Sequence, residues 1–493
     1  MKKRTAYLAI DFGTSNVHAS VIDAETTQIL VNTNKKYSWY YPAQNQVELH
    51  IEETWEASKW AVDEVIRQLP EDVELLAITF SYFGDSITPV DENGEALYGM
   101  LPGFCGRSFK EVQTIARELG ADQYAKITGN TLSTLATPSK IMWLRDNEPE
   151  VYRRAAGFYS NQQYIMRRLG LGDVQDRTMA ARKLMIDVKA NCWSAPILEL
   201  AGVTEQQLGT QIVESATVVG RIDHYGEVKL PCALPVTIGC HDVSASLLSA
   251  GVQLEKPDTI GVLMGTYEQM GYFSDTFVDG CNDFGDSLIF SCCYSSPFNN
   301  KYTVMDAFPT AGALLEWFCM NLLRDPLADI GKLIAAAKLD GTGSLMMLPY
   351  VENFHGAVVG MSLSTTTDEI FAAILESLAY QFVACVDYIR STRPQPFRNL
   401  HFGGGGSRTD KLLQLRADLI QAPLGRMQNI ELPSLGACML AGLGNGWYAS
   451  VQDASNHMCN PVTYFEPIPE NEKKYAERYA RYKAISADYL YRY

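Results

Sequence analysis

The sequence predicts an α/β protein of two similarly built domains, and three observations lead to this fold class. The chain has 493 residues, enough for two separate hydrophobic cores. Short apolar runs typical of strands alternate with longer stretches of helical periodicity. A strand–Gly-Thr–strand pattern occurs at Gly13-Thr14 and again at Gly265-Thr266, which are 265 − 13 = 252 positions apart. A unit repeated at the head of each half indicates two α/β domains that face one another.

The first half begins with a hairpin, followed by a helix and a buried strand. Strands are expected at 7–10, 17–22 and about 28–33, a helix at about 51–69 and a buried strand at 74–80. Asp11 ends the first strand, although a hairpin turn needs no carboxylate there, so we expect a chemical role for it. The polar turn at 81–86 follows the buried strand, and ligands of open α/β sheets bind at the carboxyl ends of strands.

The remaining elements follow the same alternation. The region 109–190 is expected to be mostly helical with a break at Pro149, and 236–252 to form a strand, a tight turn and a helix of small residues. The second half repeats the hairpin at 259–275 and continues with a strand, a glycine turn and an amphipathic helix at 399–420. A further helix of small residues is expected in "ELPSLGACMLAGLGNGWY". In the tail, an aromatic stripe at i, i+4, i+7 favours docking of a terminal helix over a cofactor site; its members are Tyr475, Tyr479 and Tyr482.

Composition excludes several classes of function. The formal charge of −16 argues against a nucleic-acid partner or an anionic membrane surface, because both need basic patches. There is no run of about 18 uninterrupted apolar residues, so no membrane-spanning helix and no secretory signal are expected. The 11 cysteines show no C-x-x-C spacing, which favours buried reduced thiols in a cytoplasmic protein.

Three glycine-containing turns at strand ends are candidate phosphate sites, since such turns expose backbone N–H groups. They lie at 11–14, at 265–266 and at 403–407. Neither a G-x-x-x-x-G-K-[ST] loop nor a G-x-G-x-x-G turn after the first strand is present, so a P-loop and a Rossmann dinucleotide site are not expected. Two facing Gly-Thr hairpins could hold a triphosphate between the domains, and the tetra-glycine turn would let a nucleotide base approach the backbone.

An ordered set of segments resembles the motifs of the FGGY family of carbohydrate kinases over essentially the whole chain. These segments are "LAIDFGTSN", "IGCHDVSAS", "VLMGTYEQ", "PTAGALLEWF", "MMLPYVENF", "GGGGSRTDKLLQLRAD" and "LPSLGACMLAG". The resemblance implies the actin-like ATPase superfamily, with two ribonuclease-H-like domains flanking a catalytic cleft. It implies a first domain at 1–245 that binds mainly the sugar and a second at 246–493 that binds mainly ATP. The implied reaction is phosphorylation of a sugar hydroxyl by ATP with Mg²⁺.

The resemblance also assigns roles to single residues. Asp242 matches the catalytic base, which would accept the hydroxyl proton; a helix cap is its other interpretation, and both roles can coexist. Asp11 matches the aspartate that works with Mg²⁺ at the phosphates. The first phosphate turn is Gly13, Thr14 and Ser15, and the second is Gly265 and Thr266. The adenosine surface is Gly312, Glu316, Gly404, Gly405 and Gly406, with Asp410 as a further member.

The acceptor site departs from common members of the family. Asp85 and Ser81 fall where a polar sugar contact is expected, and Arg107 survives from a Trp-x-Asp-x-Arg motif that reads Gly103-Phe104-Cys105-Gly106-Arg107 here. Glycerol and D-xylulose are therefore not favoured, and an unusual ketose or related polyol fits better. A homodimer would be in keeping with the family. Two alternatives stay open, an actin-like ATPase without a small-molecule acceptor and a degenerate kinase that acts as a sugar sensor.

Overall fold

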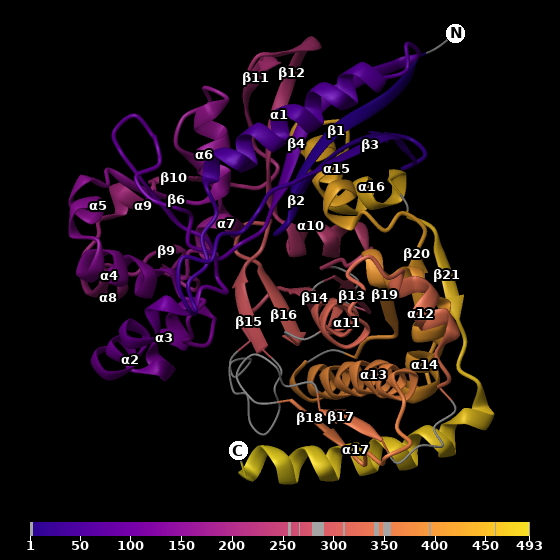
Figure 1. Ribbon diagram of the computed structural model, residues 1–493. Coiled ribbons are helices and arrows are strands. Elements are labelled where there is room, and N and C mark those ends of the chain that lie inside the picture. Colours follow the sequence, from indigo (N-terminus) through magenta and orange to yellow (C-terminus); the bar gives the residue numbers. More distant parts are fainter. Residues whose placement is uncertain are drawn as a thin grey trace.

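The computed structural model describes residues 3–254, 258–265, 267–278, 290–308, 311–339, 345–348, 356–393, 396–458 and 460–492. Two mixed sheets organise these residues (Figure 1). The first sheet has the order β11-β12-β4-β1-β2-β3, with β1 (Arg4–Phe12), β2 (Asn16–Asp23), β3 (Ile29–Lys36), β4 (Val73–Tyr82), β11 (Val218–Tyr225) and β12 (Val228–His241). The second has the order β15-β16-β14-β13-β19-β20-β21, with β13 (Thr259–Met264), β14 (Glu268–Ser274), β15 (Phe290–Ser295), β16 (Tyr302–Phe308), β19 (Asn399–Gly403), β20 (Leu424–Met427) and β21 (Val462–Phe465).

The two sheets have the same arrangement of three strands at their centre, which confirms the predicted repeat. In the first, β1 pairs antiparallel with β2 and parallel with β4. In the second, β13 pairs antiparallel with β14 and parallel with β19. Each half therefore contains a hairpin, and the first strand of the hairpin also pairs with a parallel strand from further along the chain. This mixture of pairings agrees with the predicted α/β fold class.

Helices and short strands surround these sheets. The helices of the first half are α1 (Ile51–Gln68), α2 (Phe109–Glu118), α3 (Ala121–Thr128), α4 (Thr137–Asn147), α5 (Pro149–Arg154), α6 (Asn161–Arg168), α7 (Arg177–Ala181), α8 (Ala195–Ala201), α9 (Glu205–Leu208) and α10 (Asp242–Ser249). Its short strand pairs are β5 (Thr88–Val90) with β6 (Gly157–Tyr159), β7 (Val174–Asp176) with β10 (Gln211–Val213), and β8 (Ile186–Asp187) with β9 (Cys192–Trp193). The second half adds α11 (Gly312–Phe318), α12 (Ile330–Ala336), α13 (Thr367–Thr392), α14 (Asp410–Ile420), α15 (Leu432–Gly444), α16 (Val451–His457), α17 (Glu472–Arg492), β17 (Met346–Leu348) and β18 (Ala357–Val359).

The expected first hairpin, the helix after it and the next strand are confirmed to within a few residues as β1, β2, β3, α1 and β4. α1 forms because its apolar side chains recur at helical spacing and are buried against the first sheet, among them Trp55, Ala61, Val62 and Val65. The 109–190 region is largely helical as expected, and Pro149 opens α5. The short strands β6, β7 and β8 were not expected within that region, nor were β5 before it and β9 after it.

The two small-residue helices, α10 and α15, pack against each other between the sheets. α15 also contacts β1, β4 and β12, so a helix from near the end of the chain covers part of the first sheet (Figure 1, yellow beside indigo). A Cβ on Gly436 would come within 1.8 Å of the carbonyl oxygen of Ala245, so only glycine permits this approach.

Two further helices bear on the sequence predictions. α13 is long and apolar enough to cross a membrane, but 83% of that stretch is buried inside the fold, so it is a core helix. α17 docks against α13 through its aromatic stripe, with the rings of Tyr479 and Tyr482 at 5.7 and 5.0 Å from that of Tyr380. The predicted docking of the tail is confirmed.

Candidate active site

Two aspartates lie at the carboxyl ends of the two strands that flank β4 in the first sheet, β1 and β12. In the register of the first sheet, Asp11 of β1 stands beside Ser81 of β4, and Ser81 stands beside Cys240 of β12. Asp242 follows two residues beyond Cys240 as the first residue of α10. The hydroxyl of Ser81 donates a hydrogen bond of 2.5 Å to Oδ1 of Asp11. The sheet therefore brings together three residues that the sequence predicted for the site from segments far apart in the chain.

Asp242 is held at the start of α10. Its Oδ1 accepts a hydrogen bond of 2.7 Å from the backbone N–H of Val243 and lies 3.2 Å from Nε2 of His241. The N-cap position belongs to His241, so the alternative in which Asp242 caps the helix is wrong in detail. The carboxylate instead sits in the first turn, where the helix dipole favours its charge.

The charges of these groups influence one another. Burial, followed by the nearby charge of Asp11, raises the pKa of Asp242 to about 8, against opposing effects of the Val243 N–H and of Arg182. Burial also raises the pKa of Asp11. Burial and Arg182 hold the pKa of His241 well below its usual range, so the imidazole is neutral and its 3.2 Å contact with Asp242 is not an ion pair. A carboxyl group that titrates near neutral pH suits a general base.

The 81–86 turn, called the acceptor loop here after its predicted role, is contacted by Arg182, which the sequence analysis did not identify. Nη2 of Arg182 pairs with Oδ2 of Asp85 at 2.5 Å, and its Nη1 donates to Oδ1 of Asn130 at 2.9 Å. The guanidinium lies 4.9 Å from the ring centre of Tyr294, whose hydroxyl lies 3.0 Å from Nδ1 of His241. Arg182 is 2% exposed, so its charge is compensated within the protein. This cluster joins the acceptor loop to β15 of the second half.

Two polar atoms of this pair remain unsatisfied. Oδ1 of Asp85 and Nε of Arg182 are buried and have no hydrogen-bond partner among the residues that the structure describes. Buried polar groups are nearly always bonded, so two unpaired atoms in one ion pair are unusual. The backbone of Asp85 has φ +57°, an uncommon conformation for a residue other than glycine, which the pairing with Arg182 helps to hold.

Arg107 is placed differently from Asp85. Its side chain is fully buried, pairs with Oε1 of Glu48 at 2.8 Å and lies 4.8 Å from the ring centre of Trp143. It also donates to the carbonyl of Val47 and to Tyr98. Its hydrogen bonds thus serve the packing of the 103–107 loop.

Both expected phosphate turns are hairpins at the head of a sheet. In the first, the N–H of Gly13 donates to the carbonyl of Asn16 at 2.9 Å, and the turn carries Thr14 and Ser15. In the second, the N–H of Gly265 donates to the carbonyl of Tyr267 at 3.0 Å. Thr266 lies outside the described residues.

The expected nucleotide surface adjoins the second turn. The N–H of Gly312, at the start of α11, donates to the carbonyl of Gly265 at 3.2 Å. Gly404 has φ +83°, and a Cβ there would lie 2.7 Å from the carbonyl oxygen of Met264, so the tetra-glycine turn sits directly on the end of β13. A Cβ on Gly405 would meet nothing within 4 Å, and one on Gly406 would lie 2.9 Å from Cβ of Met264.

The two carboxylates assigned to this surface lie at its exposed edge. Asp410 opens α14 and pairs with Nη1 of Arg426 at 2.5 Å, with its own side chain 74% exposed. Glu316 is an exposed residue of α11.

A metal ion at this site would need phosphate oxygens of the nucleotide as additional ligands. Within the described part of the chain, no group of three or more His, Cys, Asp or Glu side chains could hold a metal by itself. Mg²⁺ at kinase sites is typically held by one or two carboxylates together with phosphate oxygens. The carboxylate of Asp11, two residues before Gly13 and its phosphate turn, fits that arrangement.

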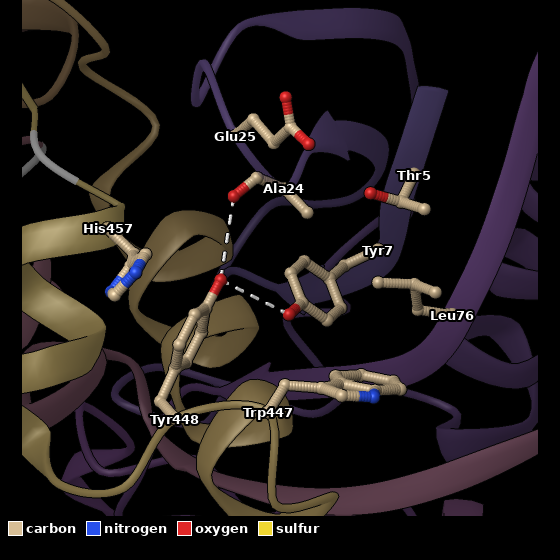
Figure 2. A pocket seen from close by; sticks show the side chains of 8 residues that line it. All are labelled: Thr5, Tyr7, Ala24, Glu25, Leu76, Trp447, Tyr448 and His457. Carbon is tan, nitrogen blue, oxygen red and sulfur yellow. Dashed lines mark hydrogen bonds between the residues drawn. The ribbon is translucent and has the colours of Figure 1, made fainter. Parts of the chain in front are cut away.

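A separate cavity of about 280 Å³ lies at the opposite end of β1 (Figure 2). It is lined by Thr5, Tyr7, Ala24, Glu25, Leu76, Trp447, Tyr448 and His457. The hydroxyl of Tyr448 bridges the two halves through long hydrogen bonds to Tyr7 at 3.4 Å and to the carbonyl of Ala24 at 3.5 Å. Half of the residues that line this cavity have aromatic side chains, and the cavity lies away from Asp11 and Asp242, so we assign it no part in the reaction.

Comparison with protein families decides the affiliation of the chain. Residues 6–249 match the N-terminal domain of the FGGY family of carbohydrate kinases, and residues 286–444 match its C-terminal domain. The chain belongs to this family. It is therefore a phosphotransferase with an alcohol group as acceptor, and ATP as phosphoryl donor follows from the family.

Individual relatives of this FGGY kinase are distant. It is similar to a xylulose kinase of Lactococcus lactis subsp. lactis, with 24% identity over 502 residues covering 98% of this chain and 96% of that protein. It is also similar to a glycerol kinase of Thermococcus gammatolerans, with 25% identity over 486 residues covering 95% and 94%.

Solved structures of the same fold include a gluconate kinase from Lactobacillus acidophilus (TM-score 0.84, 19% identity, 99% of each chain covered). Another is a xylulose kinase from Rhodospirillum rubrum (TM-score 0.82, 22% identity, 98% of each chain covered). At this identity the structures establish the two-domain fold of the FGGY kinases, and the acceptor of this chain has to be argued from its own residues.

Proposed function

We propose that this FGGY kinase transfers the γ-phosphate of ATP to a hydroxyl of a neutral ketose or related polyol. The observation that carries the proposal is the placement of Asp11 and Asp242 at the ends of strands on either side of β4, with the pKa of Asp242 raised toward neutral pH. Neighbouring strands in a sheet lie about 4.8 Å apart, so two strands that flank a third lie roughly 10 Å apart. One carboxylate can therefore face the phosphates while the other faces the acceptor.

In the proposed reaction, Asp242 accepts the proton of the attacking hydroxyl as its oxygen bonds to the γ-phosphorus and ADP leaves. The phosphate oxygens lie against the turn of Gly13, Thr14 and Ser15 and the turn of Gly265 and Thr266, where N–H groups not used within the turns donate to them. Mg²⁺, when bound, neutralises phosphate charge, and Asp11 is the residue that holds it. The neutral imidazole of His241 keeps the Asp242 carboxyl oriented, since its other nitrogen is fixed by Tyr294.

The charges around the acceptor loop favour a neutral substrate. Arg182 is compensated by Asp85, and Arg107 by Glu48. A sugar acid would bring its carboxylate toward Asp242 and Asp11 without meeting an uncompensated arginine in this cluster, and like charges in a partly buried site repel. A neutral hydroxyl compound brings no charge into this site.

We also propose the division of labour between the halves. The first domain, 1–245, would bind mainly the acceptor, and the second, 246–493, mainly ATP, with α10 at the junction. Closure of the halves would exclude water, which competes as phosphoryl acceptor. The cysteines that the structure describes are free thiols, mostly buried, which supports a reducing cytoplasmic location. A homodimer acting on small molecules, without a nucleic-acid or membrane partner, remains part of this proposal.

The test is ADP release from Mg·ATP against a panel of D- and L-ketoses and polyols, with gluconate and a no-acceptor sample alongside. Stimulation by a neutral compound is expected, and Asp242→Asn should lower turnover by about 10² or more while leaving nucleotide binding nearly intact. Strong hydrolysis without stimulation would instead support the actin-like ATPase. Sugar binding without turnover would support a sensor, and stimulation by gluconate alone would contradict the neutral acceptor.

A further inference from the structure

We propose that Trp39 is a positioning residue that couples the acceptor loops to the first phosphate turn, an inference that rests on the proposed kinase function. Nε1 of Trp39 donates a hydrogen bond of 2.7 Å to the carbonyl of Thr14. Trp39 lies three residues beyond the end of β3, on a segment that carries no motif of the family resemblance. The structure places it between two parts of the site that the sequence treats separately.

The segment 37–39 holds the carbonyl groups of the phosphate turn. The hydroxyl of Tyr37 donates to the carbonyls of Gly13 and of Asn16, the latter at 3.2 Å. The backbone N–H of Tyr37 donates to the carbonyl of Ser15 at 3.3 Å. Together with the Trp39 bond, these contacts engage the carbonyl of every residue from Gly13 to Asn16.

This arrangement matters for anion binding. A turn binds phosphate through its N–H groups, and a peptide plane that flips presents its carbonyl oxygen to the phosphate instead. Hydrogen bonds to the carbonyls oppose such a flip. Trp39 and Tyr37 therefore keep the donors of the turn oriented without touching the nucleotide themselves.

The ring of Trp39 faces the acceptor side. It makes edge contacts with Phe104, at 4.9 Å between ring centres and 78° between planes, and with Phe83, at 6.3 Å and 75°. Phe83 belongs to the 81–86 loop and Phe104 to the 103–107 loop. Such edge-to-face pairs contribute favourable energy beyond burial alone.

The family motif has an aromatic side chain at position 103, where this chain has Gly103. The contact between Trp39 and Phe104 takes the place of that side chain. A Cβ on Gly103 would lie 2.8 Å from Leu135 and 2.9 Å from Cβ of Asp85, so no larger residue fits there. Phe104 is 37% exposed, which leaves one side of its ring available to an acceptor. An acceptor that packs on Phe104 would restrain Trp39 and, through Thr14, the phosphate turn.

The consequence is a coupling between the two ligands. Acceptor bound at the 103–107 loop should tighten binding of the nucleotide phosphates, and by thermodynamic reciprocity the nucleotide should tighten binding of the acceptor by the same factor. When no acceptor is bound, the first phosphate turn is less restrained, so transfer of the phosphoryl group to water is disfavoured. Trp39 thereby contributes to the selectivity for the acceptor over water.

The first experiment measures binding of Mg·AMP-PNP and of AMP by calorimetry to the full-length wild type, Trp39→Phe and the control Trp60→Phe. Trp60 is a 41% exposed residue of α1 whose ring lies under Lys35, away from the phosphate turn. Loss of one hydrogen bond should weaken Mg·AMP-PNP binding to Trp39→Phe about 2- to 10-fold. AMP, which lacks the β- and γ-phosphates, should bind unchanged, and Trp60→Phe should match the wild type.

The second experiment uses the compound of the ketose and polyol panel that stimulates ADP release. Adding this compound should increase the affinity of the wild type for Mg·AMP-PNP. The increase should be smaller for Trp39→Phe. Phe104→Leu should bind Mg·AMP-PNP normally when alone and lose most of this enhancement. Phe104→Leu also leaves the Thr14 bond intact, so it tests the coupling even if Trp39→Phe fails to fold.

Three outcomes would overturn the proposal. They are wild-type affinity of Trp39→Phe for Mg·AMP-PNP, an equal loss of affinity for AMP, and an undiminished enhancement in Phe104→Leu. If no compound of the panel stimulates ADP release, the kinase proposal fails, but the comparison of Mg·AMP-PNP with AMP still decides whether Trp39 supports the phosphate turn.

Discussion

Replacing Asp242 by Asn should make the ligand-free protein more stable at neutral pH. The pKa of this carboxyl is about 8 in the folded protein, against 3.8 for an unperturbed aspartate. In the unfolded chain the group ionises from about pH 4, whereas in the fold it stays protonated until about pH 8. The fold therefore binds a proton more tightly than the unfolded chain does, and stability is lost as pH rises between these values. Asn has the same shape and stays neutral, so its contribution to the free energy of unfolding does not fall as the pH rises.

The magnitude follows from the two pKa values. Each tenfold change in proton concentration between them is equivalent to about 1.4 kcal/mol, so the interval from 3.8 to pH 7 bounds the effect at about 4 kcal/mol. The side chain is 27% exposed, and water reduces the effect, so we expect about 2 kcal/mol. For a domain of this size, that is a rise in Tm on the order of 4 °C.

The assay is scanning calorimetry of wild type and Asp242→Asn between pH 4 and 9 without ligands. The difference in Tm should be near zero at pH 4, widen as pH rises and become constant above about pH 8. Asp223→Asn is the control, because Asp223 is an exposed residue of β11 whose pKa is lowered by a hydrogen bond to His224, and its replacement should not stabilise progressively with pH. If the difference in Tm between Asp242→Asn and the wild type is absent or narrows as the pH rises, burial does not raise the pKa of Asp242.

Three further predictions concern Asp242, Asp11 and the glycine turn at 403–407. Because Asp242 must be ionised to accept a proton and its pKa is raised, kcat/KM for the acceptor should increase with pH up to about 8 and then level off; a flat profile from pH 6 to 9 would contradict its role as base. Asp11→Ala should lose Mg·ATP-dependent turnover, measured as a Mg²⁺ titration at fixed ATP, whereas an unchanged titration would count against its assignment. Gly404→Ala should lower stability, because its Cβ would lie 2.7 Å from the carbonyl oxygen of Met264, while Gly405→Ala has open space and should leave Tm unchanged. Gly405→Ala should nevertheless raise KM for ATP several-fold if the nucleotide lies against that turn, and normal values of both KM and Tm would remove Gly405 from the proposed nucleotide surface.

The elements with a regular local pattern could be predicted from the sequence. The first hairpin, α1 and β4 follow from apolar periodicity and turn residues. Asp11 stood out because it ends a strand, and Asp242 through the family resemblance of the segment around it. The short strands β5–β9 were missed because strands of two or three residues depend on tertiary partners for their pairing and leave no periodicity to detect.

Residues that act through distant contacts left no local pattern. Arg182 is 97 positions from Asp85, and Tyr294 is 53 positions from His241. Trp39 sits in an aromatic segment, "YSWYY", which could have drawn attention, but nothing in that segment points to Thr14. The pairing of Arg107 with Glu48 likewise arises only from the fold, so the sequence alone could not separate an arginine that contacts substrate from one that packs a loop.

The position of α15 has a consequence for how the protein is made. The first sheet is complete once His241 has been synthesised, yet the helix that covers part of it begins at Leu432, 432 − 241 = 191 residues later. At about 5–20 residues per second, ribosomes need roughly 10–40 s to synthesise that stretch. During this interval the nascent first half exposes an apolar face that native contacts cannot yet cover. The chain is therefore expected to need chaperone protection on the ribosome, and an isolated first half ending before Leu432 is expected to aggregate.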